Sequence, residues 1–424
     1  MSGLRLFDIP ESLQALDGEV TAQIAPRLIE IDELAGGNAA RVLKAFTDHR
    51  VTAGHFAGST GYGYDDRGRE VLEAVFADSM GAEDALVRTA FLSGTHTIAV
   101  ALFGLLRPGD HLLCLTGRPY DTLHGALGLG EDNNDYGSLK DFGVHYHECA
   151  LAEEGWPDET AIAAALQKRV HRVIYIQRSR GYTLRPSLSV EGIGRLVKLV
   201  RACQPEAWIV VDNCYGEFVE QVEPTAVGAD LMVGSLIKNA GGGLAPMGGY
   251  IAGRHELVER CAHRLSAPGV GREIGATMTH LRELFMGLFH APHAVAEALK
   301  TAVYAAALFE RLGYTVSPGW DAPRADIIQS VQLGGRERLI AFCRGIQRGS
   351  PVDSFALPEP APMPGYDSEV IMAAGTFIGG ASIELSADAP LREPYAVWLQ
   401  GGLDFSMAKI GVLLAAKDVL NTHE

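Results

Sequence analysis

The sequence predicts an α/β protein: a large domain built on a mainly parallel, doubly wound sheet, and a smaller α+β domain at the C-terminal end. Short apolar runs alternate with helical patterns from about residue 85 to residue 253, which is typical of a parallel sheet with crossover helices. Polar or glycine-rich stretches follow the ends of these runs, where open α/β sheets bind ligands. Beyond residue 281 the alternation gives way to a long helical stretch and to strands and helices in mixed order.

The N-terminal region is predicted to be helical. Apolar residues recur at helical spacing over 28–46, with the pair Gly36-Gly37 as an interruption. We expect an N-terminal helical segment over residues 1–54, a large domain over 55–285 and a small domain over 286–424.

The stretch 55–69 is rich in glycine and tyrosine. It holds too many aromatic residues for a disordered linker and too many glycines for a helix. We therefore interpret it as a functional loop rather than a purely structural one.

Short and mainly apolar runs are predicted to be the strands of the large domain. They cover residues 85–88, 111–115, 144–149, 172–176, 207–211, 231–234 and 247–252. Helical patterns lie between several of them, over about 95–106, 158–167 and 190–202. Strands that alternate with helices in this way run mostly parallel to one another.

The C-terminal part begins with a long helical stretch over about 277–312, which should bend or break at Pro292. Strands are expected at 315–317 and 326–333, followed by a helix near 337–348 and a proline-rich loop over 357–364. Two short strands and a last helix complete the domain.

One lysine, Lys238, lies in an unusual sequence environment. It follows the apolar run 231–234 and precedes the triplet Gly241-Gly242-Gly243, and bare glycines let another molecule approach the backbone closely. A desolvated lysine loses its proton more easily and becomes a nucleophile. Two interpretations of Lys238 remain open. It binds pyridoxal 5'-phosphate (PLP) covalently, or it is an ordinary lysine in a turn.

An aspartate supports the first interpretation. Asp212 directly follows the apolar run 207–211, so it should lie at the carboxyl end of a strand, where ligands bind. PLP needs a carboxylate against its pyridine nitrogen, because the protonated ring is the electron sink for carbanion chemistry. One crossover and one strand separate Asp212 from Lys238, which allows both to face one cleft.

Two further stretches follow strand ends. Ser93, Gly94 and Thr95 open a predicted helix, where a hydroxyl and free backbone N–H groups suit a phosphate, although an ordinary helix cap has the same pattern. Tyr120 follows the strand over 111–115, and its ring is placed to stack on a cofactor or to pack at the rim of the sheet.

Composition narrows the function classes. The chain has 424 residues, 47% of them hydrophobic, and a net charge of −16, which argues against nucleic acid as a partner, since phosphate backbones are bound by clustered Lys and Arg. Its six cysteines show no paired or zinc-type spacing, as expected in a reducing cytoplasm. No apolar run has the length of a membrane span or of a signal core. We expect a cytoplasmic protein with no membrane partner.

Other motifs are weaker. The chain has no Gly-Lys dipeptide and hence no Walker loop, and Gly192-x-Gly194 lacks the third glycine of a dinucleotide site. His145 and His147 point to one face of a predicted strand and could chelate a metal. They show no partner spacing, so ordinary surface or core histidines are favoured and no metal is expected.

Together, three stretches resemble the Cys/Met-metabolism PLP enzymes of fold type I, and more closely the methionine γ-lyase-like branch known as aluminium-resistance or cystathionine β-lyase-like proteins. They are residues 93–96 (SGTH), 211–217 (VDNCYGE) and 234–243 (GSLIKNAGGG). The resemblance runs from about residue 60 to residue 402. Its most specific parts are residues 62–67 (YGYDDR), the Lys238 loop and residues 382–388 (SIELSAD).

The resemblance implies roles for the residues already described. Lys238 would form the Schiff base and act as a general base, and Asp212 would contact the pyridine nitrogen. Tyr120 would stack on the ring. The cofactor phosphate would lie on the helix that opens at Ser93, Gly94 and Thr95, and on Ser235.

The resemblance also implies a composite site. In related enzymes a tyrosine and an arginine of the adjacent subunit reach the phosphate, and Tyr64 and Arg67 match that loop. These two are three positions apart, whereas the better-known members place them two apart, and Ile237 stands where those members have a hydroxyl residue. A homo-oligomer follows, with a dimer as the minimum and a tetramer expected.

The reaction itself is not displayed by the sequence. Elimination from a sulfur-containing amino acid, at the β or γ position, is the favoured activity. An aminotransferase or another PLP enzyme of amino acids is the alternative, and a protein that only binds PLP is a third. Arg392 should bind the substrate carboxylate, because the planar fork of arginine matches a carboxylate. Arg178 and Arg180 are its competitors.

Overall fold

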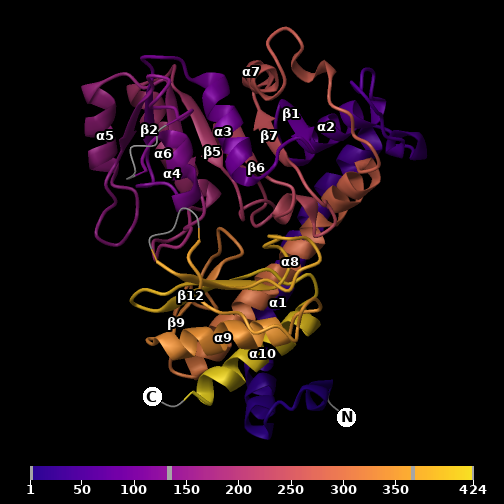
Figure 1. Cartoon of the computed structure of the whole chain (residues 1–424), viewed down its shortest axis with the longest axis vertical. Helices are drawn as coiled ribbons and strands as arrows, with labels where there is room; N and C mark the ends of the chain where they lie inside the picture. Colours follow the sequence, from indigo (N-terminus) through magenta and orange to yellow (C-terminus); the bar gives the residue numbers. More distant parts are fainter. Residues whose placement is uncertain (1–2, 131–135, 364–367, 423–424) are drawn as a thin grey trace. The chain divides into compact units, whose positions relative to one another are not determined.

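The computed structural model describes residues 3–130, 136–363 and 368–422 (Figure 1). The chain divides into two compact units, one of residues 38–290 and the other of residues 1–37 together with 291–424. The division falls within the two long helices, α1 (Glu11–Asp48) and α8 (Leu281–Arg311). Residues 1–37 therefore group with the C-terminal part, whereas the sequence suggested a separate N-terminal segment.

The unit of residues 38–290 is built on a seven-stranded sheet in the order β1-β7-β6-β5-β4-β2-β3. The strands β3, β2, β4, β5 and β6 are joined by parallel pairings, and β7 runs antiparallel to both β6 and β1. The strand bounds are β1 Asp84–Arg88, β2 His111–Cys114, β3 His145–Glu148, β4 Val173–Gln177, β5 Trp208–Asp212, β6 Leu231–Ser235 and β7 Gly249–Gly253. The predicted mainly parallel α/β fold is confirmed.

The sheet is covered by the helices that its crossovers form. α3 (Gly94–Leu105) contacts β6, β7 and the helix α7 (His255–Leu265), while α6 (Val190–Cys203) packs with α5 (Glu159–Lys168). Successive side chains of a strand point to opposite faces of the sheet. Val210 belongs to the apolar cluster that includes residues of α3 and α7, and its neighbour Val211, on the other face, is equally buried. Both faces of the sheet are therefore dry, as in parallel sheets generally.

Several helices depart from the sequence-based expectation. α1 runs unbroken through Gly36-Gly37, and α8 runs unbroken through Pro292, where a bend or break was predicted. Propensity is a weak prior that packing can override, and most of α8 after Pro292 is buried. The sequence analysis did not predict α7 or the helix α2 (Arg67–Ser79).

Helix α2 begins inside the stretch that was interpreted as a loop. Asp66 caps it, accepting a hydrogen bond from the backbone N–H of Arg69 at 3.0 Å. The same carboxylate accepts from the hydroxyl groups of Ser59 and Thr277. The loop interpretation thus holds only up to Asp66, because a strong cap starts a helix at Arg67.

The second unit is an α+β structure. Its five-stranded antiparallel sheet has the order β10-β11-β12-β9-β8. The helices α9 (Arg336–Arg348) and α10 (Phe405–Leu420) pack side by side (Figure 1). Three strands, where two were predicted, follow α9. The strand bounds are β8 Thr315–Ser317, β9 Gln329–Gln332, β10 Val370–Ala373, β11 Ser386–Pro390 and β12 Ala396–Gln400.

Within the described ranges, no helix combines the length and the apolar character that crossing a membrane requires.

Candidate active site

The carboxyl ends of the central strands bring the predicted site residues together. Asp212 is the last residue of β5, and its register partners are Gln177 at the end of β4 and Val233 in β6. Ser235 ends β6, and Lys238 follows in the next turn. Because these strands are parallel, residues far apart in sequence end at one side of the sheet.

Asp212 is a buried and well-oriented carboxylate. It is 4% exposed, its Oδ1 accepts a hydrogen bond from the Cys214 backbone N–H at 3.1 Å, and its Oδ2 accepts one from the Tyr175 hydroxyl at 3.3 Å. Burial raises the pKa of this carboxyl, while the charge of Lys238 and the hydrogen bonds act in the opposite direction.

Lys238 lies in the same electrostatic environment. Its Nζ is 3.9 Å from the centre of the Tyr215 ring, a cation–π contact. Burial works to lower the pKa of this ammonium group, but the acidic groups of Cys214, Tyr215 and Asp212 raise it above its ordinary range. The sequence-based expectation of an easily deprotonated lysine is therefore wrong for the protein's own groups, since acidic neighbours outweigh desolvation.

Glycine is required around this lysine for steric reasons. A Cβ at Gly241 would lie 1.7 Å from the Leu236 carbonyl oxygen, far inside any contact distance. A Cβ at Gly234, in the strand that leads to Lys238, would lie 2.5 Å from Cε1 of Tyr250 and 2.6 Å from Oε1 of Glu217. The glycines therefore serve the protein's own packing.

The helix α3 begins at the same side of the sheet. Ser93 caps it, accepting a hydrogen bond from the His96 backbone N–H at 3.1 Å. A Cβ at Gly94 would lie 3.5 Å from Cβ of Ser235 and 3.6 Å from Sγ of Cys214. The N-terminus of this twelve-residue helix thus adjoins the ends of β5 and β6, where free N–H groups attract an anion.

Tyr120 joins these elements to the rest of the site. Its hydroxyl is 2.8 Å from Oγ1 of Thr95, and its backbone N–H donates to Oε1 of Gln177 at 2.9 Å. Burial and the charge of Asp212 raise the pKa of the Tyr120 phenol, and the bond with Thr95 opposes that change. The phenol is therefore neutral in the physiological range.

The loop residues Tyr64 and Arg67 lie in a different setting. Tyr64 is 59% exposed and its ring centre is 5.7 Å from that of Tyr62. Arg67 is the exposed first residue of α2. Their exposure leaves both side chains accessible to another molecule.

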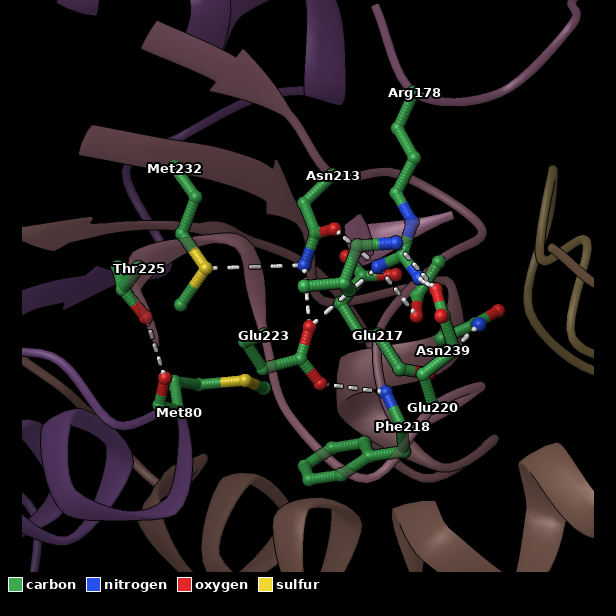
Figure 2. Close-up of polar contacts among 12 residues, drawn as sticks. Met80, Arg178, Asn213, Glu217, Phe218, Glu220, Glu223, Thr225, Met232 and Asn239 are labelled. Atoms are coloured by element: carbon green, nitrogen blue, oxygen red, sulfur yellow. Dashed lines mark hydrogen bonds and ion pairs between the residues drawn. The ribbon is translucent and has the colours of Figure 1, made fainter. Parts of the chain in front are cut away.

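The three candidate arginines are placed very differently. Arg178 is fully buried and donates to Oδ1 of Asn213 at 2.8 Å and to Oε2 of Glu220 at 2.6 Å, so it is committed to the protein's own network (Figure 2). Arg180 is buried too, and its Nε is 3.5 Å from Oγ of Ser187. Arg392 lies in the exposed turn between β11 and β12.

A buried polar network supports the loop that carries Lys238, and sequence reasoning assigned it no role. Figure 2 shows Glu223 between Asn213, whose Nδ2 donates to it at 3.0 Å, and the backbone N–H of Phe218, which donates at 2.9 Å. Asn239 donates through Nδ2 to the carbonyl oxygen of Glu217 at 3.1 Å. The only available signal was the run of polar residues after the apolar strand 207–211.

Comparison with known proteins places this site in a family. The family model described as methionine gamma-lyase matches residues 13–420. The chain belongs to the methionine γ-lyase family.

Three relatives span nearly the whole chain. One is a carbon–sulfur lyase involved in aluminium resistance from Clostridium novyi. Its sequence is 46% identical to this chain, and its crystal structure superposes with a TM-score of 0.93 over 97% of each chain. A Listeria monocytogenes protein, proposed to be a cystathionine β-lyase involved in aluminium resistance, is 50% identical, with a TM-score of 0.93, and covers 96% of this chain and 100% of its own. The uncharacterized protein YnbB of Bacillus subtilis is 50% identical over 97% of both chains.

Membership of this family implies PLP as the cofactor, and the residues present fit it. A buried carboxylate at the end of β5 suits a protonated ring nitrogen. Lys238 would supply the amine, and Tyr120, whose hydroxyl is bonded to Thr95 of α3, would supply an aromatic ring. The N-terminus of α3, with Thr95 and Ser235 beside it, suits a phosphate. The fold-type-I assignment made from sequence is confirmed.

Proposed function

We propose that this protein is a PLP-dependent carbon–sulfur lyase that eliminates a sulfur-bearing group from the β or γ carbon of an amino acid. One observation supports the proposal above all. A buried carboxylate, Asp212, and a lysine, Lys238, lie at adjacent strand ends in a member of the methionine γ-lyase family.

Each group has a task that its surroundings permit. Asp212 is fixed by two hydrogen bonds and holds the ring nitrogen in its protonated form. Lys238 moves a proton at the substrate α carbon as the general base. When bound, PLP supplies the electron sink that makes this proton acidic. Tyr120 holds the ring plane, and the N-terminus of α3, from Ser93 to Thr95, binds the phosphate with Ser235.

The net reaction consumes water and balances without an oxidant. In β-elimination a proton leaves the α carbon, the carbon–sulfur bond breaks, and the sulfur takes up a proton and departs as a thiol. In γ-elimination a proton must also leave the β carbon before the carbon–sulfur bond breaks, and the γ carbon takes up a proton afterwards. Hydrolysis of the remaining enamine releases ammonia and a 2-oxo acid. Transamination would instead conserve the amino group and release no ammonia, so the products separate the two activities.

The experiment is a product assay over a panel of amino acids, including cystathionine, methionine, cysteine and alanine. Stoichiometric thiol, ammonia and 2-oxo acid from a sulfur amino acid would support the proposal, with Lys238→Ala as the inactive control. A 2-oxo acid that forms only when a second 2-oxo acid is supplied, without ammonia, would make the protein an aminotransferase.

The proposal extends to a composite active site. The exposed side chains of Tyr64 and Arg67 are accessible to the cofactor phosphate of an adjacent subunit, which makes a dimer the minimal unit and a tetramer of paired dimers its expected form. Mixing the inactive variants Arg67→Ala and Lys238→Ala should restore part of the activity, because one site of each mixed dimer would be intact. If subunits shown to exchange give no activity, the loop serves its own subunit.

A further inference from the structure

A second carboxyl group, that of Glu217, lies fully buried beneath the Lys238 loop. Its side chain is 0% exposed, and its Oε1 accepts a hydrogen bond from the Tyr250 hydroxyl at 2.8 Å. Among the described residues, its other oxygen, Oε2, has no hydrogen-bond partner. A buried carboxylate with an unsatisfied oxygen is costly, so its presence requires an explanation.

Glu217 is packed directly against the segment that carries Lys238. A Cβ on Gly234, four residues before the lysine, would lie 2.6 Å from Oε1 of Glu217. Asn239, next to the lysine, donates to the Glu217 carbonyl oxygen at 3.1 Å. The residue therefore contacts the loop on both sides of Lys238.

The groups that face Glu217 stabilise a negative charge there too little to offset burial, although the backbone N–H of Glu217 itself and the Tyr250 hydroxyl both favour the charged form. Tyr250 from β7 donates one hydrogen bond, and Cys214 on the same segment is a buried thiol whose pKa burial raises. Glu223 adds a negative charge, and Lys238, whose charge is already opposed by Asp212, acts only weakly. Burial raises the pKa of Glu217 to about 8.

The neighbouring acid shows the contrast. Glu223 is also buried, but it accepts hydrogen bonds from Asn213 and the Phe218 backbone and lies 3.6 Å from Nη1 of Arg178. Its charge is compensated on several sides. In the part of the chain that the structure describes, Glu217 forms no ion pair with an arginine, although the two residues belong to one network (Figure 2).

We propose that Glu217 is a neutral carboxylic acid in the folded protein and a positioning residue for Lys238. Its proton keeps the negative charge of a second carboxylate away from the lysine, beside which Asp212 already lies. When Glu217 loses that proton, the new negative charge stabilises the ammonium form of Lys238 and raises its pKa. This inference rests on Lys238 acting as proposed above, but its tests do not require turnover.

A purely packing role would not explain an acid at this position. Glutamine has the same shape, keeps an oxygen for Tyr250 and does not titrate. An acid held neutral makes the folded state less stable as pH rises, because the unfolded chain ionises at its ordinary pKa of about 4.3 while the folded group keeps its proton. Perturbed acids of this kind cluster at functional sites.

The first test is infrared spectroscopy of the wild-type protein between pH 6 and pH 9. A buried neutral carboxyl group should give its carbonyl stretching band at pH 6, and the band should disappear as the group ionises near pH 8. The band should be missing at every pH in Glu217→Gln and unchanged in Glu206→Gln, a surface control. A wild-type spectrum without the band would overturn the proposal, whatever the enzyme's activity.

The second test compares pH profiles. In the PLP-loaded wild type, the visible absorbance of the bound cofactor should show a transition near pH 8 that Glu217→Gln lacks, and Tm of the variant should exceed that of the wild type increasingly from pH 5 to pH 8. If Glu217 serves packing alone, the wild type and Glu217→Gln should show the same absorbance transition, and the difference between their Tm values should not change with pH. Either result would refute the proposal. If no amino acid is turned over, these readouts still decide the state of Glu217.

Discussion

The two ends of the strands in the large sheet both carry titratable groups, but in opposite arrangements. At the carboxyl ends, Asp212 and Lys238 carry opposite charges, and each favours the charged form of the other. At the amino ends, like groups gather: the ring of His111 is 4.7 Å from that of His145 and 5.2 Å from that of His147.

The histidine cluster is a set of groups that suppress one another's charge. Burial, followed by the neighbouring His147 and His111, lowers the pKa of His171 to about 4. Nδ1 of His111 lies 2.9 Å from Nε2 of His147, which is also 2.9 Å from Nη1 of Arg169. The lowered pKa values of His111, His147 and His171 keep these three rings neutral near pH 7. Opposite charges distinguish the active-site end from this one.

The largest expected effect comes from removing the cation at the active-site end. Lys238→Ala should lower turnover by about 10³-fold or more, because a positioned general base contributes up to about 10⁴-fold and the covalent anchor is also lost. Borohydride reduction followed by peptide mapping should fix PLP on Lys238 in the wild type. An equally stable adduct and full turnover in the variant would place the anchor elsewhere.

Removing the anion should be nearly as severe. Truncating one partner of a buried charge pair costs about 3–5 kcal/mol, so Asp212→Ala should reduce turnover by roughly 10²-fold or more and weaken PLP binding. Measuring kcat together with PLP affinity checks this. Near-normal turnover would show that another group faces the pyridine ring.

A smaller effect is expected for the substrate carboxylate. Arg392→Ala should weaken amino-acid binding by about 2–4 kcal/mol, as truncation of a paired charge does, and leave PLP binding intact. KM and substrate-induced spectral changes measure it, with Arg180→Ala as the competing variant. If Arg392→Ala binds its amino acid as tightly as wild type and Arg180→Ala does not, Arg180 is the anchor.

The smallest effect on activity is expected for the histidine cluster, which should instead change how the free energy of unfolding depends on pH. The unfolded chain protonates histidine near pH 6.5, whereas folded His171 takes its proton only at about pH 4, so stability is lost as pH falls through that window. His171→Phe should reduce this acid sensitivity by at most about 3 kcal/mol and leave kcat unchanged. Denaturant unfolding at pH 7 and pH 4.5 measures it, and equal losses in both proteins would contradict the lowered pKa.

The positions of the main site residues at strand ends could be predicted from the sequence. The apolar runs before Asp212 and Lys238 predict parallel strands that end together, because chemistry at the carboxyl ends of such a sheet needs polar groups directly after buried strands. The glycines after Lys238, the helix opened by Ser93 and the tyrosine after β2 followed from the same rule. Local pattern was sufficient for these because each depends on its own short segment.

The effect of these groups on one another's pKa values depends on contacts that form only in the folded chain. The sign of the Lys238 pKa shift depends on acidic side chains of residues 212–215, whereas desolvation considered alone had suggested the opposite sign. Arg178 is an active-site candidate in the sequence and a structural residue in the fold, since Asn213 and Glu220 surround it. Burial and charge are sums over neighbours distant in sequence, and for that reason the unpaired oxygen of Glu217 became visible only in the folded chain.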